Sequence, residues 1–402
     1  MKKLMILGGS RYAIPVIKSA HELGIKVITC DYLPDNIAHK YSDEYCNVSV
    51  IDKDMVLEIA QEKMIDGIIS FACDPGVVSA AYVAEKMGLP FQGSYEAVSI
   101  LQDKGLFRNF LQENGFNCPK AKRYISKEEA IKDAVEFKWP VIVKPTDSAG
   151  SKGVTKVENI EALGIAIEEA KKYSHNKAFI IEEFLSFKGY HSSTDVFTIN
   201  GEIKFITFSD QLFDSNALNP YTPSLIIWPT TMERKNQIYL SKEIQRLMNL
   251  LGMRTGIYNI ETCVATDDKP YIMEVSPRGG GCKIAELQKY AFGVDLIEEE
   301  VRSAVGMPLF DIKHSNCDGC WCEMVIHADN DSEGVFDRLI IDDRIKDKYI
   351  KELDISINKG DIVYPFSGAN ASIGDVFFRF ENRGELEEVM GNITEYIKIV
   401  TE

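Results

Sequence analysis

The sequence lacks a long hydrophobic run. No apolar segment approaches the roughly 20 residues that a membrane-spanning helix needs. Its first residues, MKKLMILGGSRYAIP, turn directly into a glycine loop rather than into a signal-peptide cleavage region. We therefore expect a cytoplasmic protein that has no membrane partner.

Positive charge is also scarce. The chain has 45 Lys and Arg against 61 Asp and Glu, which gives a net charge of −16. A nucleic-acid backbone would be repelled by most of such a surface. The composition excludes a general nucleic-acid binder but leaves room for a local cationic pocket.

Cysteine is present without a clear pairing pattern. An odd number, nine, is scattered along the chain, which favours reduced thiols over a disulfide framework. His314, Cys317, Cys320 and Cys322 in HSNCDGCWC have a spacing that suits zinc. No second Cys or His pair follows at a suitable distance, so we favour thiols beside a strand and keep a metal site as the alternative.

The length of 402 residues indicates roughly two to four domains. In the first hundred residues, predicted strands (KLMILGG, KVITCDY, DGIISFAC) alternate with predicted helices. This order predicts a doubly wound parallel sheet. Its binding edge is expected at the carboxyl ends of the strands, around Gly8-Gly9-Ser10 and Cys73-Asp74.

A nicotinamide dinucleotide is the competing ligand for this first sheet. The dinucleotide fingerprint needs glycines at positions 8, 10 and 13, which hold Gly8, Ser10 and Ala13. Asp31 does end the second predicted strand, where a ribose-binding acid would lie. Because the middle glycine is missing, we favour a loop at the mouth of a substrate cleft.

From Lys104 onward the pattern changes to a helix followed by strands joined by tight turns. KWPVIVKP, KAFIIEEFL, HSSTDVFTING and EIKFITFSD are predicted strands, and Asn200-Gly201 is a hairpin signal between the last two. A helix, IYLSKEIQRLMNLLG, and a strand pair around Asp267-Asp268 follow. No internal repeat interrupts this α+β region.

The segment VIVKPTDSAGSKGV, residues 141–154, places Lys144 at the end of a strand and Lys152 in a Ser/Gly loop. Backbone N–H groups freed by glycine, beside ammonium groups, suit a polyphosphate. The loop is not a Walker P-loop, because the order Gly150-Ser151-Lys152-Gly153 does not match that motif. Taken alone, a basic surface hairpin is an equally good interpretation.

Two glutamates, Glu261 and Glu274, lie near the middles of adjacent predicted strands. Carboxylates side by side repel each other unless a cation bridges them, and such a pair suits Mg²⁺. A single glutamate here would be read as a surface residue of an edge strand. Arg278, followed by three glycines, can reach a phosphoryl oxygen in a bidentate fork. Lysines, glycine loop, carboxylate pair and arginine together predict phosphoryl transfer from ATP.

Together these motifs resemble the ATP-grasp superfamily, and within it the carboxylate–amine ligases, over essentially the whole chain. The resemblance implies a multidomain protein of α/β and α+β class. A Rossmann-like preceding domain would span 1–103, the two α+β subdomains of the ATP-grasp domain 104–190 and 191–310, and a small C-terminal α+β domain 311–402. The last of these includes GANASIGDVFFRF.

The resemblance also implies ATP and Mg²⁺ as cofactors, with Mn²⁺ as a substitute. Lys104 and Lys144 would contact the phosphates, and residues 147–154 would form a mobile flap. In the hinge IIEEFL, Glu182 would face the adenine amino group, and the backbone of Glu183 and Phe184 would face the ring edge. The implied nucleotide contacts are Lys104, Lys144, Ser148, Gly150, Ser151, Gly153, Val154, Glu182, Glu183, Phe184 and His191. Glu261 and Glu274 match the magnesium ligands, and Arg278 matches the catalytic arginine.

Two positions depart from the family pattern. His191 stands where the family usually has a glutamate for the ribose hydroxyls, and neutral histidine can still bond a hydroxyl. Ser276 stands where an asparagine is usual, and its shorter side chain would reach Mg²⁺ only through water.

The implied chemistry transfers the γ-phosphoryl group to a carboxylate, and an amine then displaces phosphate from the acylphosphate. The expected partners are a small-molecule carboxylate and an amine, such as amino acids or small metabolites, and a homodimer stays open. Residues 205–233 have no Lys or Arg but contain Asp210, Asp214 and Trp228, which suits a cationic or aromatic amine if they line the cleft. An acidic surface loop is the equal alternative.

Two other functions remain in view. A nicotinamide-dependent oxidoreductase would use the first sheet but leaves Glu261, Glu274 and Arg278 without a role. A nucleotide-binding regulatory protein without turnover would keep the ATP site but release no ADP.

Overall fold

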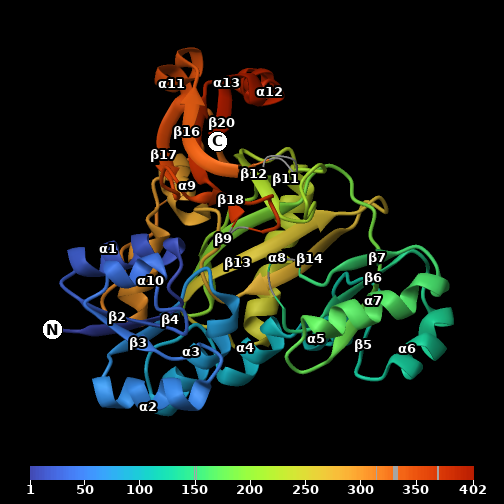
Figure 1. Cartoon of the computed structure of the whole chain (residues 1–402). Coiled ribbons are helices and arrows are strands. Elements are labelled where there is room, and N and C mark those ends of the chain that lie inside the picture. Colours follow the sequence, from blue (N-terminus) through green and yellow to red (C-terminus); the bar gives the residue numbers. More distant parts are fainter. Residues whose placement is uncertain (149, 151, 314, 329–333, 369–370) are drawn as a thin grey trace.

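The computed structural model describes residues 1–148, 150, 152–313, 315–328, 334–368 and 371–402. Ser151 and His314 lie outside these residues, so their predicted roles are not addressed below. The described chain forms five sheets with helices packed against them (Figure 1). It is a mixed α/β protein of several domains, and none of its described helices is long and apolar enough to cross a membrane.

The first sheet is parallel, as the alternation of strands and helices predicts. Its strand order is β3-β2-β1-β4. The strands are β1 (Lys3–Leu7), β2 (Lys26–Asp31), β3 (Glu44–Asn47) and β4 (Gly67–Ser70). The helices of this part are η1 (Arg11–Ala13), α1 (Ile14–Glu22), η2 (Ile37–Lys40), α2 (Lys53–Lys63) and α3 (Asp74–Met87). The loops after β1 and β4 lie at the same edge and bring Gly8 against Cys73.

Two consecutive helices, α4 (Tyr95–Gln102) and α5 (Lys104–Glu113), lead out of this sheet. Asp103 separates them and caps α5, because its carboxylate accepts the N–H groups of Gly105 and Leu106. This cap fixes Lys104 at the first turn of α5.

The second sheet is antiparallel, with the order β5-β8-β6-β7. Its strands are β5 (Ala121–Tyr124), β6 (Val141–Pro145), β7 (Thr155–Val157) and β8 (Phe179–Glu183). Val141 and Val143 share a core with α6 (Lys127–Asp133) and α7 (Ile160–Lys172), and η3 (Ala134–Glu136) follows α6. Since strand residues alternate in direction, Lys144 and Glu182 face away from these helices.

The third sheet has the order β10-β9-β13-β14 and lies between the first two (Figure 1). Its strands are β9 (Ser192–Ile199), β10 (Glu202–Phe205), β13 (Gly256–Val264) and β14 (Pro270–Ser276). Helix α8 (Arg234–Leu250) packs on one face, while α9 (Ile284–Phe292) and α10 (Leu296–Ala304) pack on the other. The predicted hairpin forms at Asn200-Gly201, where both residues have positive φ angles of 53° and 81°.

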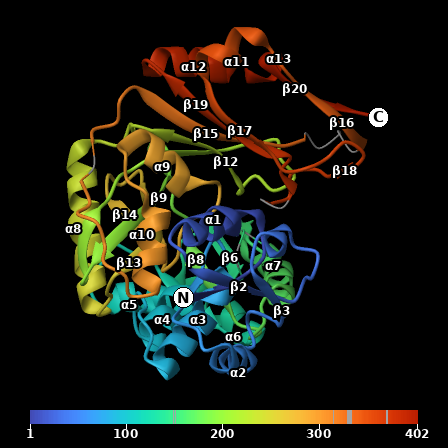
Figure 2. The same ribbon diagram turned by 90° about the vertical axis from the view of Figure 1, so that its left-hand side faces the viewer.

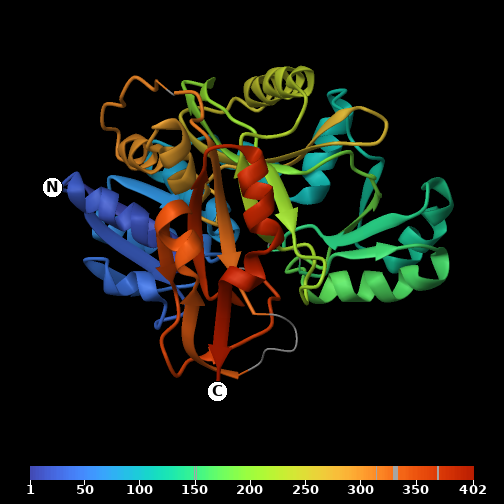
Figure 3. The ribbon, with the colours of Figure 1, turned by 90° about the horizontal axis from the view of Figure 1, so that it is seen from above.

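The remaining strands form a five-stranded sheet and a three-stranded sheet that stand over the rest of the molecule (Figures 2 and 3). The larger one has the order β11-β12-β15-β19-β17, with β11 (Asp210–Phe213), β12 (Pro223–Trp228), β15 (Cys320–Ile326), β17 (Ile350–Ile355) and β19 (Gly374–Phe380). The smaller one has β16 (Gly334–Ile341), β18 (Ile362–Val363) and β20 (Ile397–Thr401), and the helices are α11 (Asp343–Tyr349), α12 (Arg383–Gly391) and α13 (Ile393–Tyr396). The larger sheet therefore joins strands from both sides of position 310.

The segment 205–233 contributes β11 and β12 to this sheet, so Asp210 and Trp228 lie in strands rather than in a surface loop. Asp210 is buried, pairs with Arg383 at 3.0 Å, and accepts a hydrogen bond from Thr230 at 2.7 Å. Trp228 is fully buried in the core. These two residues are structural, so the idea that they recognise a cationic or aromatic amine is not supported.

Candidate active site

The two predicted metal ligands lie directly opposite each other. The antiparallel register of β13 and β14 pairs Glu261 with Glu274, which places both side chains on one face of the sheet. Burial, and then the charge of Glu274, raise the pKa of Glu261 to about 7. Two carboxylates held this way favour a shared cation, and hard oxygen ligands fit Mg²⁺.

No group of three or more acidic, histidine or cysteine side chains in the described part of the chain could hold a metal ion. A divalent cation between Glu261 and Glu274 would therefore need further oxygens, such as those of a phosphate. By the same finding, Cys317, Cys320 and Cys322 do not form a metal site by themselves. His314, the fourth residue of the predicted zinc motif, lies outside the described residues.

Lys104 links the carboxylate pair to the predicted flap. Its ammonium nitrogen lies 3.6 Å from a carboxylate oxygen of Glu274 and donates to the Ser148 carbonyl at 3.1 Å. Gly150 and Gly153 have φ angles of 67° and 71°, in the region that favours glycine. Val154 is half-buried just before β7.

Glu182 is engaged differently from the expectation. Its carboxylate accepts from Lys144 at 3.0 Å and from Arg108 at 2.5 Å; Glu182 and Arg108 are buried, and Lys144 is half-buried. Burial alone would raise the pKa of Glu182, but the charges of Arg108 and Lys144 outweigh it and lower this pKa to about 2. Each carboxylate oxygen has a cationic partner, so Glu182 orients Lys144 in this structure, and its contact with the adenine amino group stays a prediction.

Arg108 was not among the predicted residues, although the sequence held a signal for it. It lies four residues after Lys104 in α5, and residues at this spacing share one face of a helix. Burial opposes its charge, and Glu182 offsets that effect, so that the pKa of Arg108 is raised overall.

The backbone of the predicted hinge is partly occupied. The N–H of Glu183 donates to the Lys120 carbonyl at 2.9 Å, and that of Phe184 donates to the Pro140 carbonyl at 3.1 Å. Among the described residues, the Leu185 N–H has no acceptor. The available hinge donor is therefore Leu185, one residue beyond the predicted pair.

His191 lies in an aromatic cluster, with ring centroids 4.0 Å from Phe187 and 5.5 Å from Phe213. Burial lowers the pKa of His191 to about 4, so the ring is neutral near pH 7. A neutral ring is what hydroxyl recognition requires.

Arg278 is held by Asp74, which lies at the start of α3. Its Nε and Nη2 donate to the two oxygens of Asp74 at 2.9 and 2.7 Å, and Nη1 donates to the Gly279 carbonyl at 3.1 Å. Three of the five guanidinium N–H groups are thus used. One hydrogen on each terminal nitrogen remains, which is a second fork that can hold a phosphoryl or carboxylate group.

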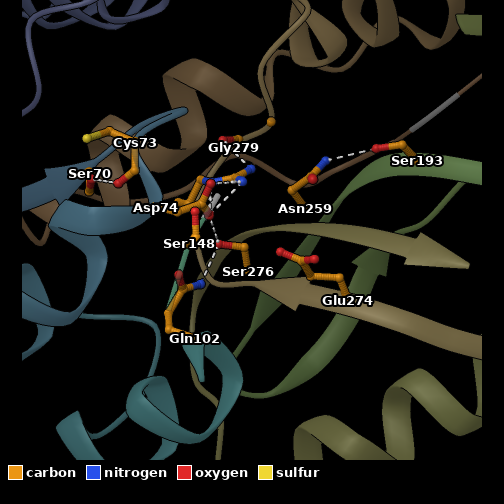
Figure 4. Close-up of polar contacts among 12 residues, drawn as sticks. Ser70, Cys73, Asp74, Gln102, Ser148, Ser193, Asn259, Glu274, Ser276 and Gly279 are labelled. Atoms are coloured by element: carbon orange, nitrogen blue, oxygen red, sulfur yellow. Dashed lines mark hydrogen bonds and ion pairs between the residues drawn. The ribbon is translucent and has the colours of Figure 1, made fainter. Parts of the chain in front are cut away.

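Ser276 belongs to the same network (Figure 4). Its hydroxyl donates to Asp74 at 2.7 Å and accepts from Gln102 at 2.6 Å. Burial would raise the pKa of Asp74, but Arg278 keeps it below its usual value. Ser276 therefore positions Asp74 in this structure, and its contact with Mg²⁺ through water stays a prediction.

The glycine run after Arg278 is fixed by close contacts. The Gly280 N–H donates to both oxygens of the fully buried Asp195, at 2.9 and 3.0 Å, and Asn259 donates to the same carboxylate. A Cβ atom on Gly279 would lie 2.2 Å from the ring of Phe71. Burial raises the pKa of Asp195 to about 6, although these hydrogen bonds oppose the shift.

A cavity of about 500 Å³ opens beside Glu274 and Lys104. It lies between the flap and the first domain. Its lining residues are Ile51, Asp52, Lys53, Asp54, Asp74, Pro75, Val78, Ser79, Tyr95, Gln102, Lys104, Asp147, Ser148, His175 and Glu274. A space of this size fits a small metabolite.

Fold and site together define a multidomain α/β protein with cationic and acidic side chains gathered around one cleft. Residues 101–282 match the family model described as ATP-grasp domain. Over these residues the chain is similar to the ATP-grasp family.

Relatives in sequence are distant. The chain is 24% identical over 291 residues to the carbamoyl phosphate synthase large chain of Thermotoga neapolitana, an alignment that covers 72% of this chain and 26% of that protein. It therefore spans about a quarter of the length of that relative. It is 25% identical over 332 residues to the formate-dependent phosphoribosylglycinamide formyltransferase of a Synechococcus species, covering 81% and 82% of the two chains.

Solved structures share the fold over the full length. The L-amino acid ligase from Bacillus licheniformis has a TM-score of 0.83 at 18% identity, covering 100% of this chain and 99% of that one. Phosphoribosylglycinamide synthetase from Anaerococcus prevotii has a TM-score of 0.80 at 21% identity, with 100% of both chains covered. The biotin carboxylase domain of a Hydrogenobacter thermophilus carboxylase, solved with MgADP and bicarbonate, has a TM-score of 0.78 at 17% identity, covering 100% and 91%.

Proposed function

We propose that the protein is an ATP-dependent ligase that joins a carboxylate to an amine through an acylphosphate and releases ADP and phosphate. The observation that carries the proposal is that the Glu261–Glu274 pair, Lys104 and the network of Arg278 meet beside one cavity. Several relatives are a synthase, a synthetase and a ligase, and these activities support the proposal.

The nucleotide would lie between the second and third sheets. Lys144, oriented by Glu182, and Lys104, at the start of α5, supply cations for the phosphates. The Leu185 N–H is the hinge donor for the adenine edge, and neutral His191 serves the ribose hydroxyls. Ser148, Gly150, Gly153 and Val154 belong to the flap that covers the phosphates.

Glu261 and Glu274 would hold Mg²⁺, which neutralises phosphoryl charge when it is bound. The free fork of Arg278 orients the phosphoryl group toward the substrate carboxylate, and Lys104, beside Glu274, adds a second positive charge. Asp74 is a positioning residue, because it acts through Arg278. Preorganised charge and proximity supply most of the acceleration in such a site.

The structure gives a reason to prefer ATP over a nicotinamide dinucleotide. Asp31, the candidate ribose acid, accepts the N–H groups of Gly9 and Leu33, both at 2.9 Å, and the side chain of Asn36 at 3.0 Å. Its carboxylate holds the loop after β1 and has little capacity left for a ribose. A titration with NAD that saturates stoichiometrically would reverse this preference.

The proposal is tested by a screen of carboxylates crossed with amines in the presence of ATP and Mg²⁺. ADP, phosphate and a condensed product by mass are expected, whereas AMP and pyrophosphate would contradict an acylphosphate route. ATP binding without ADP release across the screen would favour the regulatory alternative.

Glu274→Gln provides the residue-level test. It keeps the shape of the side chain and removes one charge, so turnover should fall by orders of magnitude while the protein stays folded. Glu202→Gln is the matched control, since Glu202 lies in β10 at the edge of the same sheet and pairs with Lys204. Full activity of folded Glu274→Gln at limiting Mg²⁺ would remove the metal site.

A further inference from the structure

Two cysteines lie directly opposite each other in the first sheet. The parallel register of β2 and β3 pairs Cys30 with Cys46. Residues that are paired in this way point to the same face of a sheet. Both side chains pack in the apolar layer between this sheet and the helices α2 and α3, and both are free thiols in this structure.

The separation of the two backbones suits a disulfide. Neighbouring strands lie about 4.8 Å apart, and the Cα atoms of disulfide-bonded cysteines usually lie about 4.4–6.8 Å apart. The thiols of Cys30 and Cys46 are hydrogen-bond partners, so their sulfur atoms are already in contact. The bond can therefore form without a rearrangement of the sheet.

Cys46 has the features of a reactive thiol. It is half-buried in the edge strand of the sheet, whereas Cys30 is fully buried. The hydrogen bond from Cys30 and, less strongly, the charge of Lys63 outweigh the effect of burial and lower the pKa of Cys46 to about 7. The thiolate is the nucleophile in thiol oxidation. Near neutral pH, Cys46 is thus the attacking group, and Cys30 is the second thiol beside it.

Strand β3 leads to the cavity beside the reaction centre. The strand ends at Asn47, and Val48 and Val50 anchor the next residues in the same apolar layer. Residues 51–53 then line the cavity. Since β3 lies at the edge of the sheet, with β2 as its neighbour, a covalent bond to β2 would fix the segment that carries this part of the cavity wall.

We propose that Cys30 and Cys46 form a reversible disulfide in response to a hydroperoxide, and that this bond stiffens the segment that leads to the cavity. The Cys46 thiolate attacks one oxygen of the hydroperoxide, the O–O bond breaks, and hydroxide or alkoxide leaves, which gives a sulfenic acid on Cys46. The Cys30 thiol then attacks that sulfur. The S–S bond forms, the S–O bond breaks, and the proton of Cys30 leaves with the hydroxyl group as water. The two sulfur atoms together lose two electrons, which reduce the hydroperoxide, and a dithiol reverses the change by thiol–disulfide exchange.

The test is oxidation of the reduced full-length protein with hydrogen peroxide, followed by blocking of the remaining free thiols and digestion with trypsin. Trypsin cleaves after Lys26, Lys40 and Lys53, so the two cysteines fall in separate peptides, 27–40 and 41–53. We expect these peptides to be joined, with a mass two hydrogen atoms below their sum, and to separate after treatment with dithiothreitol. Unjoined peptides after oxidation of the wild type overturn the proposal.

Cys320 and Cys322 are the matched control pair. They lie two residues apart in β15, and burial raises the pKa of both thiols. We expect Cys30 and Cys46 to be oxidised at least tenfold faster than this pair, and an equal rate would contradict the inference. In Cys30→Ala the oxidation of Cys46 should stop at the sulfenic acid, which dimedone traps. A folded variant without this adduct would refute the role of Cys46 as the attacking thiol.

Hydrogen exchange measures the consequence for the cavity wall. The backbone amides of residues 44–53 should exchange at least about threefold more slowly in the oxidised protein than in the reduced one, while those of α8 stay unchanged. Cys46→Ser treated with peroxide should show no slowing. Unchanged exchange at 44–53 in the oxidised wild type would refute the stiffening. These measurements use neither ATP nor substrates, so their outcome is independent of the ligase proposal.

Discussion

Replacing Asp74 with asparagine tests whether the first domain positions the catalytic arginine. The substitution keeps the shape of the side chain but removes the charge that holds Arg278. An amide can accept a hydrogen bond through its oxygen, but it presents N–H groups to the second guanidinium nitrogen. The variant therefore loses one of the two charge-assisted hydrogen bonds, together with the charge compensation.

The size of the effect follows from burial. The side chains of Arg278 and Asp74 are 10% and 20% exposed, so the pair is mostly but not fully desolvated. A hydrogen bond to a charged group contributes about 1.5–3 kcal/mol, and breaking a fully buried pair costs about 3–5 kcal/mol. We expect Asp74→Asn to lower the free energy of unfolding by about 2–3 kcal/mol, measured by urea denaturation.

The effect on catalysis should exceed the effect on nucleotide binding. Without Asp74 the free fork of Arg278 is no longer aimed, and misplacement of a catalytic group by about 1 Å can cost about 10²-fold in rate. We expect kcat to fall by about 10²-fold while KM for ATP changes less than threefold. Asp66→Asn, in the same domain, is the control, because its carboxylate accepts the Lys3 backbone N–H at 2.8 Å and does not contact Arg278. A wild-type kcat in Asp74→Asn, with stability lowered as stated, would show that Asp74 is structural only.

Further predictions concern single groups. The pKa of Glu261 is raised to about 7, so the native metal-free protein keeps a proton that the unfolded chain releases. The free energy of unfolding should therefore fall as pH rises from about 4.5 to 7. Thermal melts of Glu261→Gln should lose this trend. Mg²⁺ affinity, measured by titration, should increase over the same pH range. The pKa of His191 is lowered by burial to about 4, so stability should be lost as pH falls from about 6.5 to 4; melts of His191→Phe should remove that loss, and KM for ATP should rise. Glu182→Gln should raise KM for ATP at least tenfold, because Lys144 and Arg108 would then share a buried site without a counter-charge; an unchanged KM would contradict that role. ATP should slow trypsin cleavage after the exposed Lys152, and equal rates with and without ATP would count against the flap.

Local patterns were sufficient for much of the fold and for the carboxylate pair. Two strands joined by a short turn around Asp267-Asp268 must be antiparallel neighbours, so Glu261 and Glu274 were expected side by side, and the register pairs them directly. Asn200-Gly201 fixed the other hairpin through residues that tolerate positive φ. The alternation of strands and helices fixed the parallel first sheet.

Contacts between distant segments were not predictable in this way. Asp74 and Arg278 are 204 positions apart, and only the packing of the first domain against the third sheet brings them together. The contact of Glu182 with Arg108, which lies in α5 more than seventy positions earlier, had no local signal in the strand that carries Glu182. No periodicity indicates that β12 would pair with β15, about a hundred residues later.

The segment from Arg278 to Lys283 has two halves that the rest of the protein holds in different ways. The side chain of Arg278 is fixed by Asp74 from the first domain, and the backbone of Gly280 is fixed by the buried Asp195 from β9. Beyond Gly280, the side chain of Lys283 is tied to Asp354 at 2.7 Å, while the backbone at 282–283 is strained and the space beside Gly281 is open. Phosphoryl transfer needs donors that do not move, whereas substrate entry needs a loop that does. The half that holds Arg278 is rigid and the half at 282–283 is strained, so one end of the loop can rearrange without displacing Arg278.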